Sequence, residues 1–186
     1  MPNSLQETLD LILIENRTVL ERVDPNAITQ LMAAIVESQR IFVTGEGRSG
    51  LVMKMFAMRL MHLGCQDFVV GETITPSIQK GDLLIDCSGS GSTGNVLAIA
   101  KTAKTTGVQI VSITTQPDSA LGQLADIVIH LNAAAKQDRT QQHSQQFAGS
   151  LFEQSTLLLL DAVFHLAAKQ TNQSAETLYS LHANLE

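Results

Sequence analysis

Apolar residues along this chain change repeatedly between a helical period and short continuous runs. Over residues 4–22 they recur at helical spacing, and Asp24 and Pro25 then supply a cap and a first-turn proline for a second helix that ends near residue 38. Short β-rich runs follow, and helical or turn segments separate them. In chain order the runs are RIFVTGEG, DFVVGE, LLIDCS, VQIVSIT and DIVIHL.

Strands that alternate with helices predict an α/β fold with a doubly wound, five-stranded parallel sheet flanked by helices. We expect a single domain over 1–186, with N-terminal helices at 4–38, an α/β core at 40–131 and C-terminal helices at 150–186. Residues 132–149 are polar, rich in Gln and without a period, which predicts a mobile loop. The helix that follows this loop is apolar nearly all round, so part of its surface is expected to meet another subunit.

The amino-acid composition argues against nucleic acids and membranes as partners. The formal net charge is −6, Lys and Arg do not cluster, and aromatic residues make up 4% with no Trp, so no nucleic-acid partner is expected. The N-terminus lacks a basic start and acids interrupt its apolar run, which predicts a cytoplasmic protein without a membrane partner. Cys65 and Cys87 stand far apart without a metal-ligand pattern, and we interpret them as free thiols.

Two glycine-rich loops lie where predicted strands end and helices begin. Residues 45–50 read GEGRSG and residues 89–94 read GSGSTG, and both fit the dinucleotide pattern G-x-G-x-x-G. A dinucleotide site at the first loop would use an acid about 20 residues further on, where Glu72 stands. A dehydrogenase normally needs further chain to hold its substrate, so the dinucleotide is the less favoured alternative.

The second loop favours a terminal phosphate. A helix begins directly after it, and the free N–H groups and positive dipole end of a helix N-terminus attract an anion. No Lys follows in the pattern of an NTPase P-loop, which excludes that class. A Ser-rich helix cap without a ligand is the alternative. The loop carries hydroxyl side chains at Ser88, Ser90, Ser92 and Thr93.

The spacing of Ser88, Ser90 and Thr93 after the third predicted strand resembles the SIS (sugar isomerase) domain family. More narrowly, segments along nearly the whole chain resemble the 6-phospho-3-hexuloisomerase family: GEGRSGLVMKMFAMRLMHLG, VVGETITP, GDLLIDCSGSGST, LFEQSTLLLLDAV and HANLE. The resemblance implies an isomerase that converts D-arabino-3-hexulose 6-phosphate to D-fructose 6-phosphate through an enediol, in the ribulose monophosphate pathway of formaldehyde fixation. It also implies a homotetramer with no metal or organic cofactor. A non-catalytic sugar-phosphate-binding SIS protein is the alternative.

The resemblance also implies roles for single residues. Glu153 matches the family's proposed base, and burial among apolar neighbours would make it more basic, although acids are common in a first helical turn. His182 matches the family's terminal histidine, which related sugar isomerases supply from a neighbouring subunit; a solvated tail is the alternative. Arg48 stands at a helix start, where its charge opposes the dipole, which favours a binding role over a solvated charge. The candidates for binding the substrate and its phosphate are Ser88, Ser90, Ser92, Thr93, Gly47, Arg48, Ser49, Glu72 and Thr73.

Overall fold

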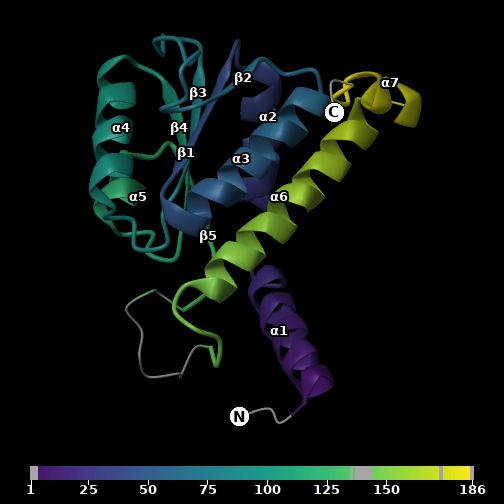
Figure 1. Ribbon diagram of the computed structural model, residues 1–186. Helices are drawn as coiled ribbons and strands as arrows, with labels where there is room; N and C mark the ends of the chain where they lie inside the picture. The colour runs from purple at the N-terminus through teal and green to yellow at the C-terminus, as the bar shows by residue number, and fades with distance from the viewer. Residues whose placement is uncertain (1–3, 135, 137–143, 172–173, 185–186) are drawn as a thin grey trace.

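A parallel sheet stands between two layers of helices in the computed structural model, which describes residues 4–134, 136, 144–171 and 174–184 (Figure 1). The sheet has five strands in the order β2-β1-β3-β4-β5, and every neighbouring pair is parallel. This order confirms the predicted doubly wound α/β fold. The strands are β1 (Ile41–Gly45), β2 (Asp67–Val69), β3 (Leu83–Cys87), β4 (Gln109–Thr114) and β5 (Ile127–His130).

Helices cover both faces of the sheet because alternate strand residues point to opposite sides. On one face Val43 and Ile85 pack in the core formed with α2, α3 and α6, and on the other Phe42 and Leu84 pack in the core formed with α4 and α5. The helices are α1 (Leu5–Leu20), α2 (Pro25–Glu37), α3 (Gly47–His62), α4 (Gly94–Thr105), α5 (Ala120–Leu124), α6 (Ser150–Gln170) and α7 (Ala175–Ser180).

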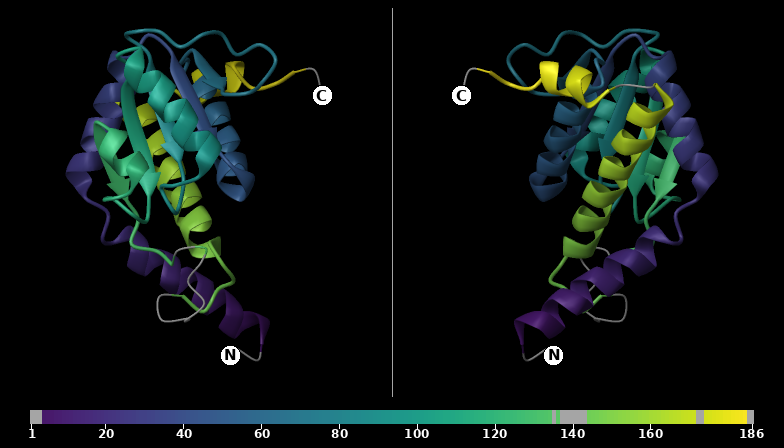
Figure 2. Two further views of the ribbon diagram at one scale, coloured as in Figure 1. Left: turned by 90° about the vertical axis from the view of Figure 1, so that its left-hand side faces the viewer. Right: turned by 90° about the vertical axis from the view of Figure 1, so that its right-hand side faces the viewer.

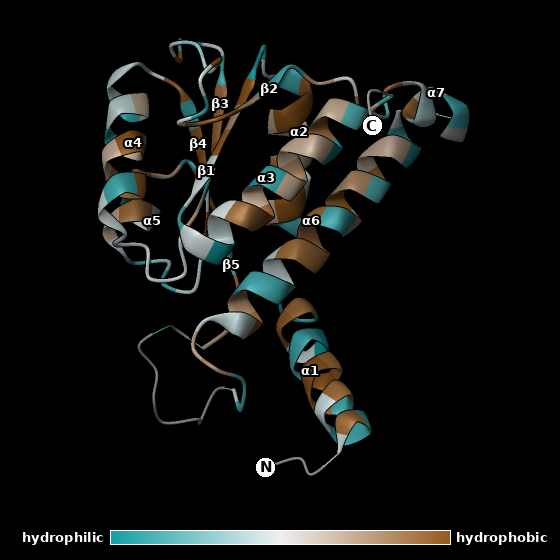
Figure 3. Cartoon of the chain, viewed as in Figure 1, coloured by the Kyte–Doolittle hydropathy of each residue, from teal (hydrophilic) through white to brown (hydrophobic). Residues whose placement is uncertain are grey.

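Two segments extend away from these layers (Figure 2). α1 projects beyond the sheet from the N-terminal end of α6, and α7 lies at the other end of α6. Apolar and polar residues interchange over the surface of α1 (Figure 3), and Leu5, Leu13 and Ile14 are exposed on it. Among the described residues, α6 is the helix long and apolar enough to cross a membrane by length and composition; half of this stretch is buried within the protein, as in a core helix.

Each of the five predicted β-rich runs contains one strand of the sheet, although β2 covers only residues 67–69 of the run DFVVGE. α3 begins at Gly47, which takes a φ of +60° and turns the chain from β1 directly into the helix. The predicted loop at 132–149 is described at 132–134, 136 and 144–149, which lie in no helix or strand. Its other residues lie outside the described part of the chain.

Candidate functional site

A pocket of about 600 Å³ opens at the carboxyl ends of β1 and β3. It forms there because α3 leaves β1 toward one face of the sheet and α4 leaves β3 toward the other, which separates the two loops. Both glycine loops line the pocket, together with the segment before α6 and its first turn. The lining includes these proposed residues: Gly47, Arg48, Ser49, Ser88, Ser90, Ser92, Thr93 and Glu153.

Three helix N-termini meet at this pocket, and none of them is capped by a side chain. The N-cap residues of α3, α4 and α6, which are Glu46, Thr93 and Gly149, make no side-chain cap hydrogen bond. In each other helix of the described chain, a Ser or Asp side chain accepts from a backbone N–H of the first turn. N–H groups left free at three helix starts form a shared region of positive charge that suits an anion, which argues against a mere Ser-rich cap.

The hydroxyl groups of the second glycine loop are held toward one another. Ser88 Oγ and Thr93 Oγ1 lie 2.8 Å apart, so Thr93 bonds across the loop and leaves the first turn of α4 uncapped. The Ser92 hydroxyl donates to Ser90 Oγ at 3.1 Å. Each hydroxyl can exchange its loop partner for a ligand oxygen, because a hydroxyl both donates and accepts.

Gly91 fixes the shape of this loop. Its φ is +59°, a left-handed conformation that favours glycine. A Cβ at this position would lie 1.9 Å from the Oγ of Ser119, which caps α5 through the N–H of Gly122. The shape of the loop is therefore set by the backbone conformation of Gly91 and by packing on α5.

An ion pair between Arg48 and Glu153 crosses the pocket. Arg48 Nε donates to Glu153 Oε2, and the Glu153 side chain is 16% exposed while that of Arg48 is 63% exposed. A second contact joins the two glycine loops, since Asn95 Nδ2 donates to Glu46 Oε1 at 2.6 Å. The carboxylate of Glu153 therefore lies on the inner wall, and the guanidinium has room to turn toward a ligand.

Two buried titratable side chains lie directly below the hydroxyl loop, at the end of β3. Burial raises the pKa of Asp86 to about 8, and the hydrogen bond from Ser112 Oγ at 3.0 Å offsets this only in part. Asp86 Oδ1 accepts no hydrogen bond from any described residue. Burial also raises the pKa of the Cys87 thiol to about 12, so this pocket residue remains a thiol and is no nucleophile.

Glu72 and Thr73 lie outside this pocket. Both are exposed in the segment after β2, at the edge of the sheet, and β1 stands between β2 and β3. The Glu72 carboxylate accepts from Lys54 Nζ at 2.6 Å, in an ion pair with α3. Within one chain, therefore, these two residues do not meet the hydroxyl loop.

His182 also lies apart from the pocket in its own chain. Its ring centroid is 5.5 Å from that of His62, in the last turn of α3, whereas Arg48 stands in the first turn of the same helix. The rise of 1.5 Å per residue separates the two ends of α3 by about 20 Å. In this arrangement of the chain, Glu153 and His182 do not meet within one subunit.

Sequence reasoning missed several residues of the pocket wall. Lys136 and Phe147 line it, and Phe147 is 89% exposed at its opening. Both belong to a polar segment without a period, which carries no pattern that locates it. The sequence did show that this segment joins β5 to α6. Its C-terminal end therefore had to lie beside the first turn of α6, which contains Glu153.

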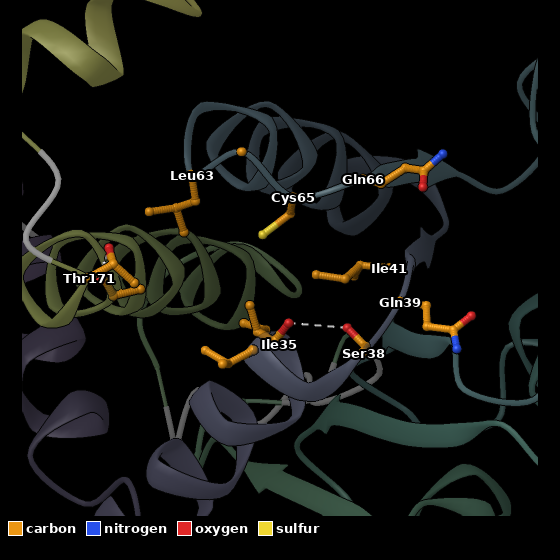
Figure 4. A pocket seen from close by; sticks show the side chains of 11 residues that line it. Ile35, Ser38, Gln39, Ile41, Leu63, Cys65, Gln66 and Thr171 are labelled. Carbon is orange, nitrogen blue, oxygen red and sulfur yellow. Dashed lines mark hydrogen bonds between the residues drawn. The ribbon is translucent and has the colours of Figure 1, made fainter.

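A second pocket, of about 360 Å³, lies at the amino end of β1, between the end of α2 and the end of α3 (Figure 4). Ile35, Ile41 and Leu63 form its apolar part, and none of its eleven lining residues is charged. It offers no cation for a phosphate. Within the described part of the chain, no group of three or more His, Cys, Asp or Glu side chains is placed to hold a metal ion.

Comparison with known proteins gives consistent results. The SIS domain matches residues 34–166. The 3-hexulose-6-phosphate isomerase of Mycobacterium gastri is 46% identical over 99% of this chain and 92% of its own, and that of Bacillus subtilis is 42% identical over 84% of this chain and 85% of its own. A solved structure from Methanococcus jannaschii, for which the function of 3-hexulose-6-phosphate isomerase was inferred, superposes with a TM-score of 0.85 at 34% identity, over 97% of this chain and 99% of its own.

Proposed function

Because the chain belongs to the SIS domain family, and its relatives include 3-hexulose-6-phosphate isomerases, we propose that it converts D-arabino-3-hexulose 6-phosphate into D-fructose 6-phosphate. In this role it is an intramolecular oxidoreductase that acts on a ketose phosphate in the ribulose monophosphate pathway. The proposal treats 1–186 as a single SIS domain. The family match favours this assignment of the glycine loops over a dinucleotide site.

One observation carries the proposal: three uncapped helix N-termini and a loop of hydroxyl groups face a carboxylate across one pocket. A phosphate dianion satisfies the free N–H groups, and the hydroxyls supply further bonds to its oxygens. The sugar then extends from the phosphate toward Glu153. The groups assigned to phosphate are the backbone at Gly47 and the residues Ser49, Ser88, Ser90, Ser92 and Thr93.

The reaction moves a carbonyl from C3 to C2 of the sugar. Glu153 removes the proton from C2, which gives a 2,3-enediol, and returns a proton to C3 as the carbonyl forms at C2. A proton must also pass between the oxygens on C3 and C2, and an imidazole can carry it in either direction. We assign this second transfer to His182.

Arg48 has two alternative partners in this scheme. In the free protein it pairs with Glu153, and the anionic substrate competes for its guanidinium. When Arg48 turns to a substrate oxygen, its ion pair with Glu153 breaks and the carboxylate is free to reach the proton on C2. Binding and activation of the base are coupled in this way.

The proposed assembly is a cytoplasmic homotetramer with sites at subunit interfaces. Exposed apolar side chains gather on α3 and α6, which pack side by side, and a partner subunit would cover them. This arrangement would bring His182 of one subunit to Glu153 of another. We assign Glu72 and Thr73 to sugar hydroxyls reached across the same interface. The apolar side chains are Leu51, Met55, Met58, Leu158 and Leu166.

The second candidate function is a non-catalytic protein that binds sugar phosphates. It would need the hydroxyl loop and the helix N-termini but no base. The enclosed carboxylate of Glu153 favours the isomerase, because a sensor has no use for an acid that repels its anionic ligand.

A coupled assay tests the proposal. 3-Hexulose 6-phosphate is generated in place from formaldehyde and ribulose 5-phosphate by the synthase, and formation of fructose 6-phosphate is followed. We expect turnover by the wild type and a loss of at least about 100-fold in Glu153→Gln, since a general base contributes about that much. Asp161→Asn is the matched control, because Asp161 is a half-exposed acid of the same helix that pairs with Arg59 and does not line the pocket.

Calorimetric binding of fructose 6-phosphate separates the candidates. Binding without turnover in the wild type would support the sensor, and no binding at all would overturn both. Turnover that survives in Glu153→Gln would leave the isomerase intact and move the base to another residue.

A further inference from the structure

The residues at the start of α6 do not themselves stabilise its first turn. Gly149 provides no side-chain cap, and Ala148 before it has a φ of 51°, a conformation that alanine adopts only at a cost in free energy. Glu153 stands in this turn. The direction in which its carboxylate enters the pocket must therefore be set by contacts from elsewhere, and α1 lies against this end of α6 (Figure 1).

Glu15 of α1 holds the segment just before the turn. Its carboxylate accepts hydrogen bonds from Ser144 Oγ at 2.7 Å, from Gln145 N at 2.8 Å and from Gln146 Nε2 at 3.0 Å. The Gln146 N–H also donates to Ser144 Oγ at 3.0 Å, which closes the cluster. Hydrogen bonds to a carboxylate are about twice as strong as neutral ones, so this cluster fixes the segment to α1.

Asn16, the next residue of α1, holds the chain just after Glu153. Its Nδ2 donates to Gln154 Oε1 at 2.8 Å, and its Oδ1 accepts from Ser155 Oγ at 2.9 Å. Asn16 is 3% exposed and Ser155 is fully buried, so water cannot replace the bond between them. Two consecutive residues of α1 thus contact the chain on both sides of Glu153.

We propose that Glu15 and Asn16 are positioning residues for the reaction, which fix the Glu153 carboxylate and the adjoining wall at Phe147. Neither residue lines the pocket, so they act through the segments they hold. The proposal rests on the proposed function of Glu153 as the base. It gives α1 a role in catalysis in addition to packing, although α1 projects away from the sheet.

The test compares Glu15→Gln with wild type in the coupled assay. The amide keeps the size of the side chain but removes the charge and one acceptor, and displacement of a catalytic group by about 1 Å can lower a rate 100-fold. We expect kcat to fall about 10-fold or more, with a changed pH dependence of kcat. Fructose 6-phosphate should bind at full stoichiometry, because the hydroxyl loop is untouched. Glu21→Gln is the matched control, since Glu21 pairs with Arg17 on the same helix.

A purely structural role would give a different result: binding stoichiometry and kcat would fall together, with an unchanged pH profile, and the proposal would be overturned. Rates equal to wild type would overturn it as well. Should Glu15→Gln fail to fold, Ser144→Ala removes the same hydrogen bond from the other side and is expected to give the same loss of kcat.

Hydrogen exchange keeps this test independent of the assignment of the reaction. In Glu15→Gln the amide of Gln145 loses its charged acceptor and keeps at most a neutral amide oxygen, and the amide of Glu153, which donates to Gly149 O at 3.1 Å, loses its fixed surroundings. Both should exchange about 10-fold faster than in wild type, whether or not the wild type isomerises the sugar. If the wild type proves inactive but exchange is faster in the variant, the positioning role of Glu15 is supported and only the assignment of the reaction fails. Unchanged exchange would overturn the positioning role.

Discussion

Arg48 occupies a position that costs free energy in the absence of a ligand, because a cation in the first turn of α3 faces the positive end of the helix dipole. Its salt bridge with Glu153 compensates in part, and an anionic ligand would compensate further. We expect Arg48→Ala to raise KM about 10-fold or more, since a charged hydrogen bond contributes about 1.5–3 kcal/mol, and to change kcat less. Steady-state kinetics in the coupled assay measures both.

The control for this substitution is Arg59→Ala. Arg59 also joins α3 to α6, through Asp161 Oδ1 at 3.1 Å, but it does not line the pocket. A similar rise in KM in both variants would mean that Arg48 only links the two helices. Arg48→Lys should recover part of the affinity, because lysine keeps the charge but lacks the planar set of N–H donors of the guanidinium.

The buried carboxyl of Asp86 ties the stability of the fold to pH. Burial raises its pKa from 3.8 to about 8, so the folded chain keeps a proton that the unfolded chain releases over this range. The stability that this group contributes is complete below pH 3.8 and is lost as the pH rises through about 8. Asp86→Asn cannot ionise, so its Tm at pH 8 should exceed that of wild type by about 3 °C or more.

Thermal unfolding at pH 5 and at pH 8 checks this expectation. The difference in Tm between variant and wild type should be larger at the higher pH. Asp67→Asn is an informative comparison, because burial raises the pKa of Asp67 to about 6, which moves its effect to lower pH. An identical pH dependence in wild type and Asp86→Asn would contradict the assignment.

Among the elements, the start of the sheet depends on one buried ion pair. Arg40 Nε and Nη2 donate to the two oxygens of Asp82 at 2.9 and 2.6 Å, and the Asp82 side chain is 1% exposed. Asp82 also accepts from Gln79 N at 2.7 Å, which closes the turn into β3. Asp82→Ala leaves the guanidinium without its anionic partner, with only the bond from Arg40 Nη2 to Ser77 O at 3.1 Å, and should lower the free energy of unfolding by about 3 kcal/mol in urea denaturation. Glu21→Ala, which breaks an exposed pair, should change the free energy of unfolding far less.

The helix starts show how far local sequence determines structure. Asp24, Ser119 and Ser174 cap α2, α5 and α7 through bonds within a few residues, and such caps are readable from sequence. Thr93 is an equally good cap by type, yet its hydroxyl bonds to Ser88 instead, a choice that depends on the folded loop. The sequence thus located the hydroxyl loop but could not show that three uncapped helix ends meet there.

The proposed site residues also divide into those that local sequence reveals and those that only the folded chain brings together. Ser88 to Thr93 are neighbours in the chain and were found as a motif. Arg48 and Glu153 stand 105 positions apart, and only the packing of α3 on α6 brings them together. Glu15 carries no sequence signal at all, because its partners lie about 130 positions away in a segment without a period.

At the scale of the whole molecule, a site shared between subunits predicts complementation in a mixture. Glu153→Gln and His182→Asn should each be inactive alone. The two variants are mixed in equal amounts, unfolded together and refolded. Half of the subunit pairs then contain one chain of each variant, and each such pair has one intact site out of two. Activity should therefore return to about a quarter of wild type. No recovery on mixing would place both residues in a site within one chain, which the length of α3 opposes.

The contact between Gly91 and Ser119 has a consequence for how this sequence can evolve. Any side chain at 91 collides with Ser119 Oγ, and loss of the Ser119 hydroxyl removes the cap of α5. A lineage would therefore have to change both positions, and the first of the two steps passes through a less stable protein. Gly91 would stay invariant among relatives even where the sugar changed, so its invariance would record packing and not the choice of substrate.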